Sequence, residues 1–316
     1  MPKRTLIQNL LLTLKGMAMG AADVVPGVSG GTIAFISGIY EELIDSLNNF
    51  NLKALVVWRK EGTPALWKHI NGTFFLFLFA GILISIFTLS KLVMFLLEAH
   101  PVLLWSFFFG LIIASVWMIG KSVKKWSIGT IASLLVGVAI AYWISSIQTT
   151  ASVDSQWYIV LSGAIAICAM ILPGVSGAFI LVLLGSYHIV YGAIADRDWL
   201  IIGLFGIGCI IGLLSFARIL KFLFKRFREI TITLLTGFMI GSLYKVWPWK
   251  MRVGDEPLVI HSDGREDWMM KNILPGDAGD AAQLWLAIGC AIGGFLLIFI
   301  LERFAPKENE NLRTDR

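Results

Sequence analysis

The chain contains the pentapeptide Pro-Gly-Val-Ser-Gly twice, at Pro26–Gly30 and again at Pro173–Gly177. Both copies interrupt apolar stretches, where proline and glycine end helices. The similarity extends beyond the pentapeptide, because the same shift of 147 residues (173 − 26) aligns Tyr40 with Tyr187. A helix break that recurs in two halves of an apolar chain is typical of a transporter with a central binding site.

The composition indicates an integral membrane protein. Hydrophobic residues make up 57% of the 316 residues, charged residues make up 15%, and the mean hydropathy is +0.78. A soluble domain usually has about a quarter charged residues. Six apolar runs approach the roughly 20 residues that cross the hydrocarbon core of a bilayer. They are Asn71–Leu97, Val102–Ile119, Ile128–Ile147, Leu200–Leu220, Ile230–Val246 and Leu284–Leu301.

The net charge of +5 does not indicate nucleic-acid binding. The basic residues cluster at the ends of the apolar runs, which favours topology signals and contacts with phospholipid headgroups. Cys168, Cys209 and Cys290 lie inside apolar segments without CxxC or metal-ligand spacing, so we interpret them as small buried hydrophobic residues.

The internal repeat continues downstream with a smaller shift. A shift of 127 (218 − 91) aligns Lys91 with Arg218 and Gly110 with Gly237. The difference of 20 residues (147 − 127) predicts an insertion in the first half, at about residues 48–71. We therefore predict an all-α integral membrane protein with two repeats. Each repeat is a broken helical hairpin, re-entrant or spanning, followed by three transmembrane helices.

The predicted organisation has two repeats and a tail. The first repeat covers residues 1–147 with its hairpin broken at 26–30, and the second covers 156–304 with its hairpin broken at 173–177. A long loop at about 249–283 lies in the second repeat and is expected to be a solvated outer loop. Residues 305–316 form a cytoplasmic tail.

The positions of lysine and arginine predict that both termini are cytoplasmic. With Lys3 and Arg4 inside and the first hairpin returning to the same side, nearly every short basic loop also lies inside. Three crossings is an odd number, so the second repeat enters the membrane from the outside. The two repeats are thus predicted to have inverted topology.

The repeated motif has the chemistry of an anion site. Proline ends the preceding helix, glycine leaves the backbone uncovered, and a serine hydroxyl can cap the next helix. A helix start with N–H groups and a partial positive charge favours a phosphate. Two such starts that meet would bind one anionic group. The candidate residues are Pro26, Gly27, Ser29, Gly30, Gly31, Thr32, Pro173, Gly174, Ser176 and Gly177. The alternative is a pair of structural kinks satisfied by neighbouring helices.

Three ionisable residues are further candidates. Asp23 precedes the first break in an apolar setting, and its repeat counterpart is Met170. It would carry a coupling proton, hold a cation beside the anion, or anchor the motif backbone, and the sequence leaves these alternatives open. Lys91 and Arg218 are repeat equivalents that would receive a phosphate at each face, or extend to the membrane interface.

The sequence contains no catalytic pattern. The four histidines are scattered, and the HExxH, GxSxG and Walker motifs are all missing. We therefore predict a protein that is not an enzyme and uses no metal, cofactor or ATP. Its energy would come from a proton or sodium gradient, or from the gradient of the substrate itself. The oligomeric state is not predicted.

The segments Ala22–Thr32 and Pro173–Phe179 resemble the bacterial polyprenyl-phosphate transporter family. The resemblance covers nearly the whole chain. It implies a multi-pass flippase for undecaprenyl phosphate in the bacterial cytoplasmic (inner) membrane. Such a flippase would return this lipid carrier from the outer to the inner leaflet after it has delivered sugars for peptidoglycan or O-antigen synthesis. The glycines and serines of the family motif correspond to Gly27, Ser29, Gly30, Gly174, Ser176 and Gly177. A small-anion channel or a secondary anion transporter is the alternative, since it uses the same helix-start chemistry.

Overall fold

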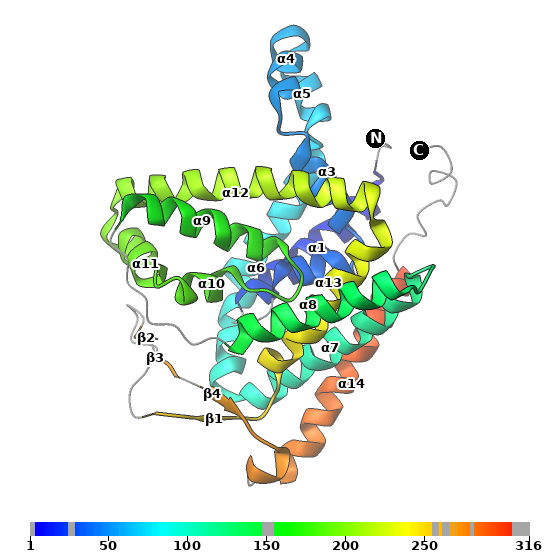
Figure 1. Cartoon of the computed structure of the whole chain (residues 1–316), viewed down its shortest axis with the longest axis vertical. Helices are drawn as coiled ribbons and strands as arrows, with labels where there is room; N and C mark the ends of the chain where they lie inside the picture. Colours follow the sequence, from blue (N-terminus) through cyan, green and yellow to red (C-terminus); the bar gives the residue numbers. More distant parts are fainter. Residues whose placement is uncertain are drawn as a thin grey trace.

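The computed structural model describes residues 4–24, 29–146, 155–254, 259–260, 266–268, 270–278 and 281–304. This part of the chain forms fourteen α-helices and four short strands. The predicted tail, residues 305–316, and the motif residues Pro26 and Gly27 lie outside the described residues. The mostly helical architecture in Figure 1 agrees with the predicted class of an all-α membrane protein.

The two motif-bearing hairpins have the same helix boundaries. The first consists of α1 (Leu6–Val24), α2 (Gly30–Ile36) and α3 (Tyr40–Asn48). The second consists of α9 (Gln156–Ile171), α10 (Gly177–Leu183) and α11 (Tyr187–Asp196). The shift of 147 relates the ends of α1 and α9, both ends of α2 and α10, and the starts of α3 and α11. In each hairpin the segment that follows the break is therefore divided into two short helices, α2 and α3 or α10 and α11.

A glycine turn follows each short helix. Gly38 has φ +74° and Gly185 has φ +65°, a left-handed conformation that glycine adopts without steric cost. The next residue then donates its N–H back into the short helix. Ile39 bonds to the Ala34 carbonyl at 3.0 Å, and its repeat equivalent Ser186 bonds to the Leu181 carbonyl at 2.9 Å.

Three long helices follow each hairpin. They are α6 (Gly72–Ala99), α7 (Pro101–Ser122) and α8 (Ile128–Ser146) in the first repeat, and α12 (Trp199–Arg226), α13 (Arg228–Val246) and α14 (Ala281–Phe304) in the second. The shift of 127 relates both ends of α6 to those of α12, and the start of α7 to that of α13. These coincident boundaries support the two predicted repeats.

Each repeat also has one extra segment. Between α3 and α6 the chain forms α4 (Leu52–Glu61) and α5 (Thr63–His69), which fill the insertion predicted at residues 48–71. Between α13 and α14, β1 (Lys250–Arg252) pairs with β4 (Met270–Asn272), and β2 (Val259–Ile260) pairs with β3 (Glu266–Asp267). A 3₁₀ turn, η1 (Pro275–Ala278), precedes α14.

Strand β1 is attached to the helices at Lys250, while Met251 and Arg252 are exposed, as expected for a solvated loop. The Lys250 ammonium donates to the Lys245 carbonyl at the end of α13 (2.6 Å) and lies 4.0 Å from the centre of the Trp105 ring of α7. Burial, with a contribution from the charge of Lys245, lowers the pKa of Lys250 to about 7.

Glycines bring pairs of long helices into backbone contact. A Cβ atom on Gly16 of α1 would lie 2.3 Å from the Leu78 carbonyl oxygen of α6, and one on Gly163 of α9 would lie 2.5 Å from the Phe205 carbonyl oxygen of α12. These contacts are repeat equivalents. Figure 1 shows α9 and α12 side by side. Small residues let helix backbones approach in this way in membrane proteins.

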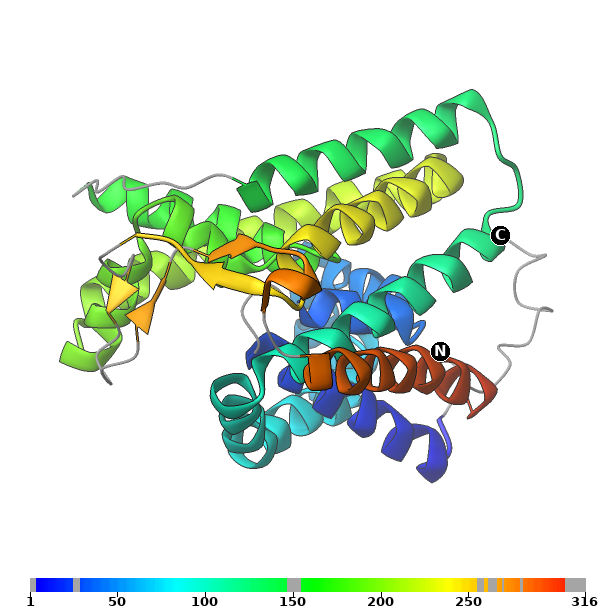
Figure 2. The ribbon, with the colours of Figure 1, turned by 90° about the horizontal axis from the view of Figure 1, so that it is seen from below.

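The last helix of each repeat packs in the other repeat. Helix α8 lies against α13, and α14 lies against α7 (Figure 2). A Cβ atom on Gly237 would lie 2.2 Å from the Leu134 carbonyl oxygen, and one on Gly110 would lie 1.9 Å from the Ala291 carbonyl oxygen. Because α7 also contacts α13, the helices α7, α8, α13 and α14 form one connected unit, called the exchanged bundle below.

Not every glycine-rich segment is a packing surface. The sequence suggests close helix contacts along Gly203–Gly212 and Gly289–Gly293. Gly208 and Gly212 do pack against α9, but a Cβ atom on Gly203, Gly206, Gly289 or Gly293 would meet open space. On α14 the residue in contact is instead Gly294, which faces the Phe107 carbonyl of α7.

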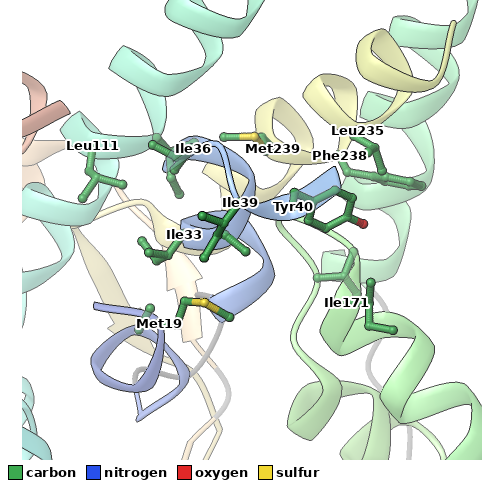
Figure 3. Packing of buried hydrophobic residues seen from close by; sticks show 14 of the residues in the cluster. Met19, Ile33, Ile36, Ile39, Tyr40, Leu111, Ile171, Leu235, Phe238 and Met239 are labelled. Atoms are coloured by element: carbon green, nitrogen blue, oxygen red, sulfur yellow. The ribbon is translucent and has the colours of Figure 1, made fainter. Parts of the chain in front are cut away.

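Helix α2 lies in the centre of the hydrophobic core. Figure 3 shows Ile33, Ile36 and Ile39 of the first hairpin among side chains from α1, α7, α9 and α13. The seven residues of α2 give a length of about 10 Å, so this helix cannot cross a bilayer alone.

Four described helices are long and apolar enough to cross a membrane. The spans are Gly72–Leu89, Pro101–Lys121, Trp199–Arg226 and Gln283–Ile300, and α8 contains a shorter apolar run. The predicted crossing Ile230–Val246 is not among them. Buried threonines such as Thr231 and Thr236 lower its hydropathy and donate to carbonyls of their own helix. Protein therefore surrounds much of α13. These features are those of a multi-pass membrane protein.

The glycine contacts of the exchanged bundle predict opposite effects for two similar substitutions. Gly237→Ala should lower the melting temperature, because overpacking against the Leu134 carbonyl costs about 1–3 kcal/mol. Gly203→Ala, which meets open space, should leave it unchanged or raise it, since alanine favours a helix by about 1 kcal/mol. Thermal unfolding of the purified protein in detergent measures both, and equal melting temperatures would contradict the packing.

Candidate functional site: two helix breaks in contact

Ser29 caps α2 and also ties it to the second hairpin. Its backbone is extended (φ −122°, ψ 135°), and its Oγ accepts the N–H of Gly31 at 3.1 Å. The same hydroxyl donates to the Met170 carbonyl at the end of α9 (3.0 Å). The predicted capping by Ser29 is confirmed, and the structure adds the bond that connects the two breaks.

Two further contacts join the breaks directly. The Thr32 Oγ1 accepts the N–H of Gly174 at 2.8 Å. Gly31 faces the end of α9 so closely that a Cβ atom would lie 2.5 Å from the Ile171 carbonyl oxygen. Glycine is required at this position because a side chain would separate the two breaks.

The second break is held by α13 and α9. Gly174 has φ +82°, and a Cβ atom there would lie 2.7 Å from the Phe238 carbonyl oxygen of α13. A Cβ atom on Gly177 would lie at the same distance from the Ala166 carbonyl oxygen of α9. Pro173 is buried and Ser176 is half-buried, and the Ser176 carbonyl accepts the N–H of Ile180 in the first turn of α10 (3.1 Å).

Two charged residues of α1 hold the two ends of α2. At its start, the Asp23 Oδ1 accepts the N–H of Gly30 at 2.6 Å. At its end, the Lys15 ammonium donates to the Ser37 carbonyl at 2.6 Å. A carboxylate at a helix start and an ammonium at a helix end both complement the helix dipole. We refer to this arrangement as the α1 clamp.

Sequence reasoning missed Lys15, although a signal was present. Lys15 and Asp23 are eight residues apart (23 − 15) on one helix, which corresponds to about 12 Å. That spacing is close to the length of α2, about 10 Å for seven residues. Two opposite charges at this distance in an apolar helix would fit the ends of a short antiparallel neighbour.

The N–H groups that the sequence analysis assigned to a phosphate at the first break already have partners within the protein. Gly30 donates to Asp23, Gly31 donates to the Ser29 hydroxyl, and Thr32 donates to the Ser29 carbonyl at 2.9 Å. A helix start buried away from water needs such partners. The contact of Asp23 is the one expected of a backbone anchor, and its coupling role stays a hypothesis.

The second hairpin has no such clamp in its described residues. Met170 stands at the position of Asp23, and Ser162 stands at the position of Lys15. The Ser162 hydroxyl bonds to the Ser186 hydroxyl at 2.7 Å, and no described carboxylate bonds to the start of α10. The two breaks therefore differ in charge although their backbones correspond.

The structure does not join every predicted residue to the breaks. Arg218 lies exposed on α12 and makes no hydrogen bond or ion pair with any described residue. The side chain of Lys91 lies outside the described residues, as do Pro26 and Gly27. The residues that do come together are Ser29, Gly30, Gly31, Thr32, Asp23 and Gly174.

Helix α3 connects the first hairpin to the second repeat by ion pairs. Glu41 pairs with Arg228 at 2.7 Å and Asp45 pairs with Lys221 at 2.8 Å. These carboxylates are about half exposed, so each pair contributes no more than about 1 kcal/mol. The amide of Asn48 adds a bond to the Ala217 carbonyl of α12 at 2.8 Å.

Tyr40, the first residue of α3, carries a buried hydroxyl. The residue is 1% exposed, and its ring packs edge-on against Phe35 and Phe224. The hydroxyl has no hydrogen-bond partner among the described residues. Figure 3 shows it between the first hairpin, Ile171 of α9 and Phe238 of α13.

Comparison with known proteins identifies the family. Residues 19–257 match the model of the VCA0040-like family, which is described as undecaprenyl phosphate translocase-like. The chain belongs to this family. The predicted resemblance of the two motifs is thus confirmed over most of the chain.

Two relatives of this translocase-like family carry the name polyprenyl-phosphate transporter. One, from Vibrio cholerae serotype O1, is 44% identical over 305 residues, covering 95% of this chain and 98% of the relative. The other, from Staphylococcus aureus, is 32% identical over 255 residues, covering 74% and 85%. No solved structure matches. The family consists of transporters, and this chain is not an enzyme.

The α1 clamp predicts that Lys15 stabilises the fold. Lys15→Met should lower the free energy of unfolding by about 1–3 kcal/mol, because the Ser37 carbonyl loses a charged donor. Lys53→Met, at an exposed position of α4, serves as the control and should have little effect. Chemical unfolding in detergent measures both. A Lys15 variant as stable as the control would show that the clamp is not needed for stability.

The hydroxyl of Tyr40 predicts an unusual response to its removal. Tyr40→Phe should leave stability unchanged or raise it, because no hydrogen bond to a described residue is lost. Tyr158→Phe is the matched comparison, since the Tyr158 hydroxyl donates to the Leu184 carbonyl at 2.7 Å. It should cost about 0.5–1.5 kcal/mol. Destabilisation by Tyr40→Phe in the same unfolding assay would show that this hydroxyl has a partner.

Proposed function

We propose that this protein is a flippase that moves undecaprenyl phosphate, or a related polyprenyl phosphate, between the leaflets of the bacterial cytoplasmic membrane. Its role is to recycle the lipid carrier for cell-envelope synthesis. The names of the two relatives support this substrate, and the alignment with one of them covers nearly the full length of both chains. The predicted topology, with inverted repeats and both termini cytoplasmic, is part of the proposal.

The phosphate binds where the two breaks meet, at Ser29–Thr32 and at Gly174, Ser176 and Gly177, with the two prolines shaping the loops. The observation that supports this site most strongly is the Asp23 contact. The Gly30 N–H donates to a carboxylate oxygen at 2.6 Å, so this backbone group binds an anionic oxygen. The substrate phosphate takes the place of Asp23, because two anions cannot share one N–H group.

This exchange gives Asp23 a role in coupling. Protonation of the carboxylate removes its negative charge and weakens its bond to the Gly30 N–H, which leaves that group for the phosphate. A proton is therefore the coupling ion that fits this geometry most simply, and sodium bound by the displaced carboxylate is the alternative. Lys91 and Arg218 receive the phosphate at the two membrane faces.

The moving parts are the hairpin units and not the complete repeats. The exchanged bundle joins α7 and α8 of the first repeat to α13 and α14 of the second through glycine–carbonyl contacts. The described hydrogen bonds between the breaks involve side chains, namely Ser29 to Met170 and Thr32 to Gly174, and Gly31 adds one close contact with the Ile171 carbonyl. Alternating access then moves one hairpin and its long partner helix against the bundle while the polyprenyl tail stays in lipid.

The two motif serines provide the test of the site. Translocation of undecaprenyl phosphate is measured in proteoliposomes for the parent chain and for Ser29→Ala/Ser176→Ala. The variant should flip at least about tenfold more slowly, since a hydrogen bond to a charged group contributes about 1.5–3 kcal/mol. The control is Ser115→Ala/Ser242→Ala, a repeat-related pair whose buried hydroxyls each donate to a carbonyl of their own helix.

The remaining outcomes separate the alternatives. Flipping by the parent with equal rates in both variants would keep the transported lipid and remove the serines from the site. A stable parent that flips no lipid but conducts chloride or inorganic phosphate would replace the proposal by a small-anion channel or a secondary anion transporter.

A further inference from the structure

The insertion that distinguishes the first repeat forms a helical hairpin outside the helical body. Figure 1 shows α4 and α5 projecting beyond α3. The second repeat has no such element, because α11 and α12 are separated by only two residues, Arg197 and Asp198. Neither α4 nor α5 contributes to the breaks or to the exchanged bundle. The hairpin therefore has no part in the site described above.

The outer face of α4 is apolar and uncovered. Leu52 is 80% exposed, Leu55 is 52% exposed and Val56 is 49% exposed. At 100° per residue these three side chains lie on one face of the helix. Ala54, on the opposite side, is the buried residue of α4. The apolar face thus points away from the rest of the protein.

The hairpin is also strongly basic. Lys53, Arg59, Lys60 and Lys68 are exposed, and Glu61 is the one acidic residue of α4 and α5, which gives a net charge of +3 (4 − 1). Lys53 and Lys60 lie beside the apolar face, and Arg59 continues it. Basic residues that flank an exposed apolar face are the pattern of a helix in the interface of an anionic membrane.

The start of α6 fixes the hairpin at the membrane boundary. The apolar span of α6 begins at Gly72, three residues after α5 ends. The indole of Trp67 donates to the Thr73 hydroxyl at 3.2 Å, and a Cβ atom on Gly72 would lie 2.3 Å from this ring. The Asn71 amide bonds to Glu42 and Ser46 of α3, both at 2.9 Å. Tryptophan is enriched at this level of a membrane protein.

We infer that the α4–α5 hairpin is a membrane-surface anchor that binds anionic phospholipid headgroups. The apolar face of α4 enters the outer part of the acyl layer, and its lysines and arginine contact the lipid phosphates. Under the topology proposed above this is the cytoplasmic leaflet. The anchor is specific to one face of the protein because only one repeat contains it. Its lipid contacts do not depend on the identity of the transported substrate.

A label on α4 tests the anchor in the full-length protein. Cys168, Cys209 and Cys290 are replaced by alanine, and an environment-sensitive fluorophore is attached at Leu55→Cys. The matched control is Glu61→Cys, which is exposed on the opposite side of α4. The proteins are reconstituted in phosphatidylcholine vesicles with or without phosphatidylglycerol. Doxyl-labelled lipids then report contact between the fluorophore and the acyl layer.

The expected result is a blue-shifted emission at position 55 that doxyl lipids quench, with little quenching at position 61. Quenching at position 55 should increase when phosphatidylglycerol is present. Lys53→Gln and Lys60→Gln should each lower the equilibrium constant for insertion of the hairpin into the lipid surface by about fivefold. Equal water exposure at positions 55 and 61 in both vesicle types would overturn the proposal. Shielding at position 55 without lipid quenching would also overturn it, and would indicate a protein partner such as a second copy of the chain.

Discussion

The interaction on which the rest of the site depends is the α1 clamp. A seven-residue helix has unpaired N–H groups at one end and unpaired carbonyls at the other, and in an apolar core these groups need partners from the protein. Asp23 and Lys15 satisfy one group at each end from a single neighbouring helix. With α2 fixed in this way, Ser29 and Thr32 can reach the second break, and the isoleucines of α2 can fill the core between the two repeats.

The clamp also makes the two breaks chemically unequal. The repeats share their turns and helix boundaries, but the charges occur in only one of them. Among the described residues one carboxylate bonds to the breaks, so an anion that binds at the first break would compete with Asp23 for the Gly30 N–H. A transporter must release its substrate as well as bind it, and an internal competitor for the same N–H group favours release.

Much of the fold followed from the sequence because the repeat shifts carry structural information. The shifts of 147 and 127 predicted the repeat and the insertion that forms α4 and α5, and the residues of the motif predicted the capping of α2 by Ser29. The same reasoning did not predict where α8 and α14 pack. Gly137 of α8 and Gly294 of α14 make equivalent contacts, and they are related by a third shift of 157 residues (294 − 137). This shift exceeds the second one by 30 residues (157 − 127) because of the loop before α14. The exchange of these helices between repeats, and the bond from Lys15 to Ser37, require the arrangement of distant segments in space.

The pattern of contacts limits how such a protein can move. Glycine–carbonyl contacts leave no space between two helices, so the pairs α7–α14 and α8–α13 can separate only by losing many packing interactions at once. The bonds between the two breaks are different, because each joins a hydroxyl to one backbone group and can be exchanged for a bond to a phosphate. Motion should therefore concentrate where side chains join the hairpins. Within the candidate site these exchangeable bonds lie beside two close glycine–carbonyl contacts, Gly31 with Ile171 and Gly174 with Phe238.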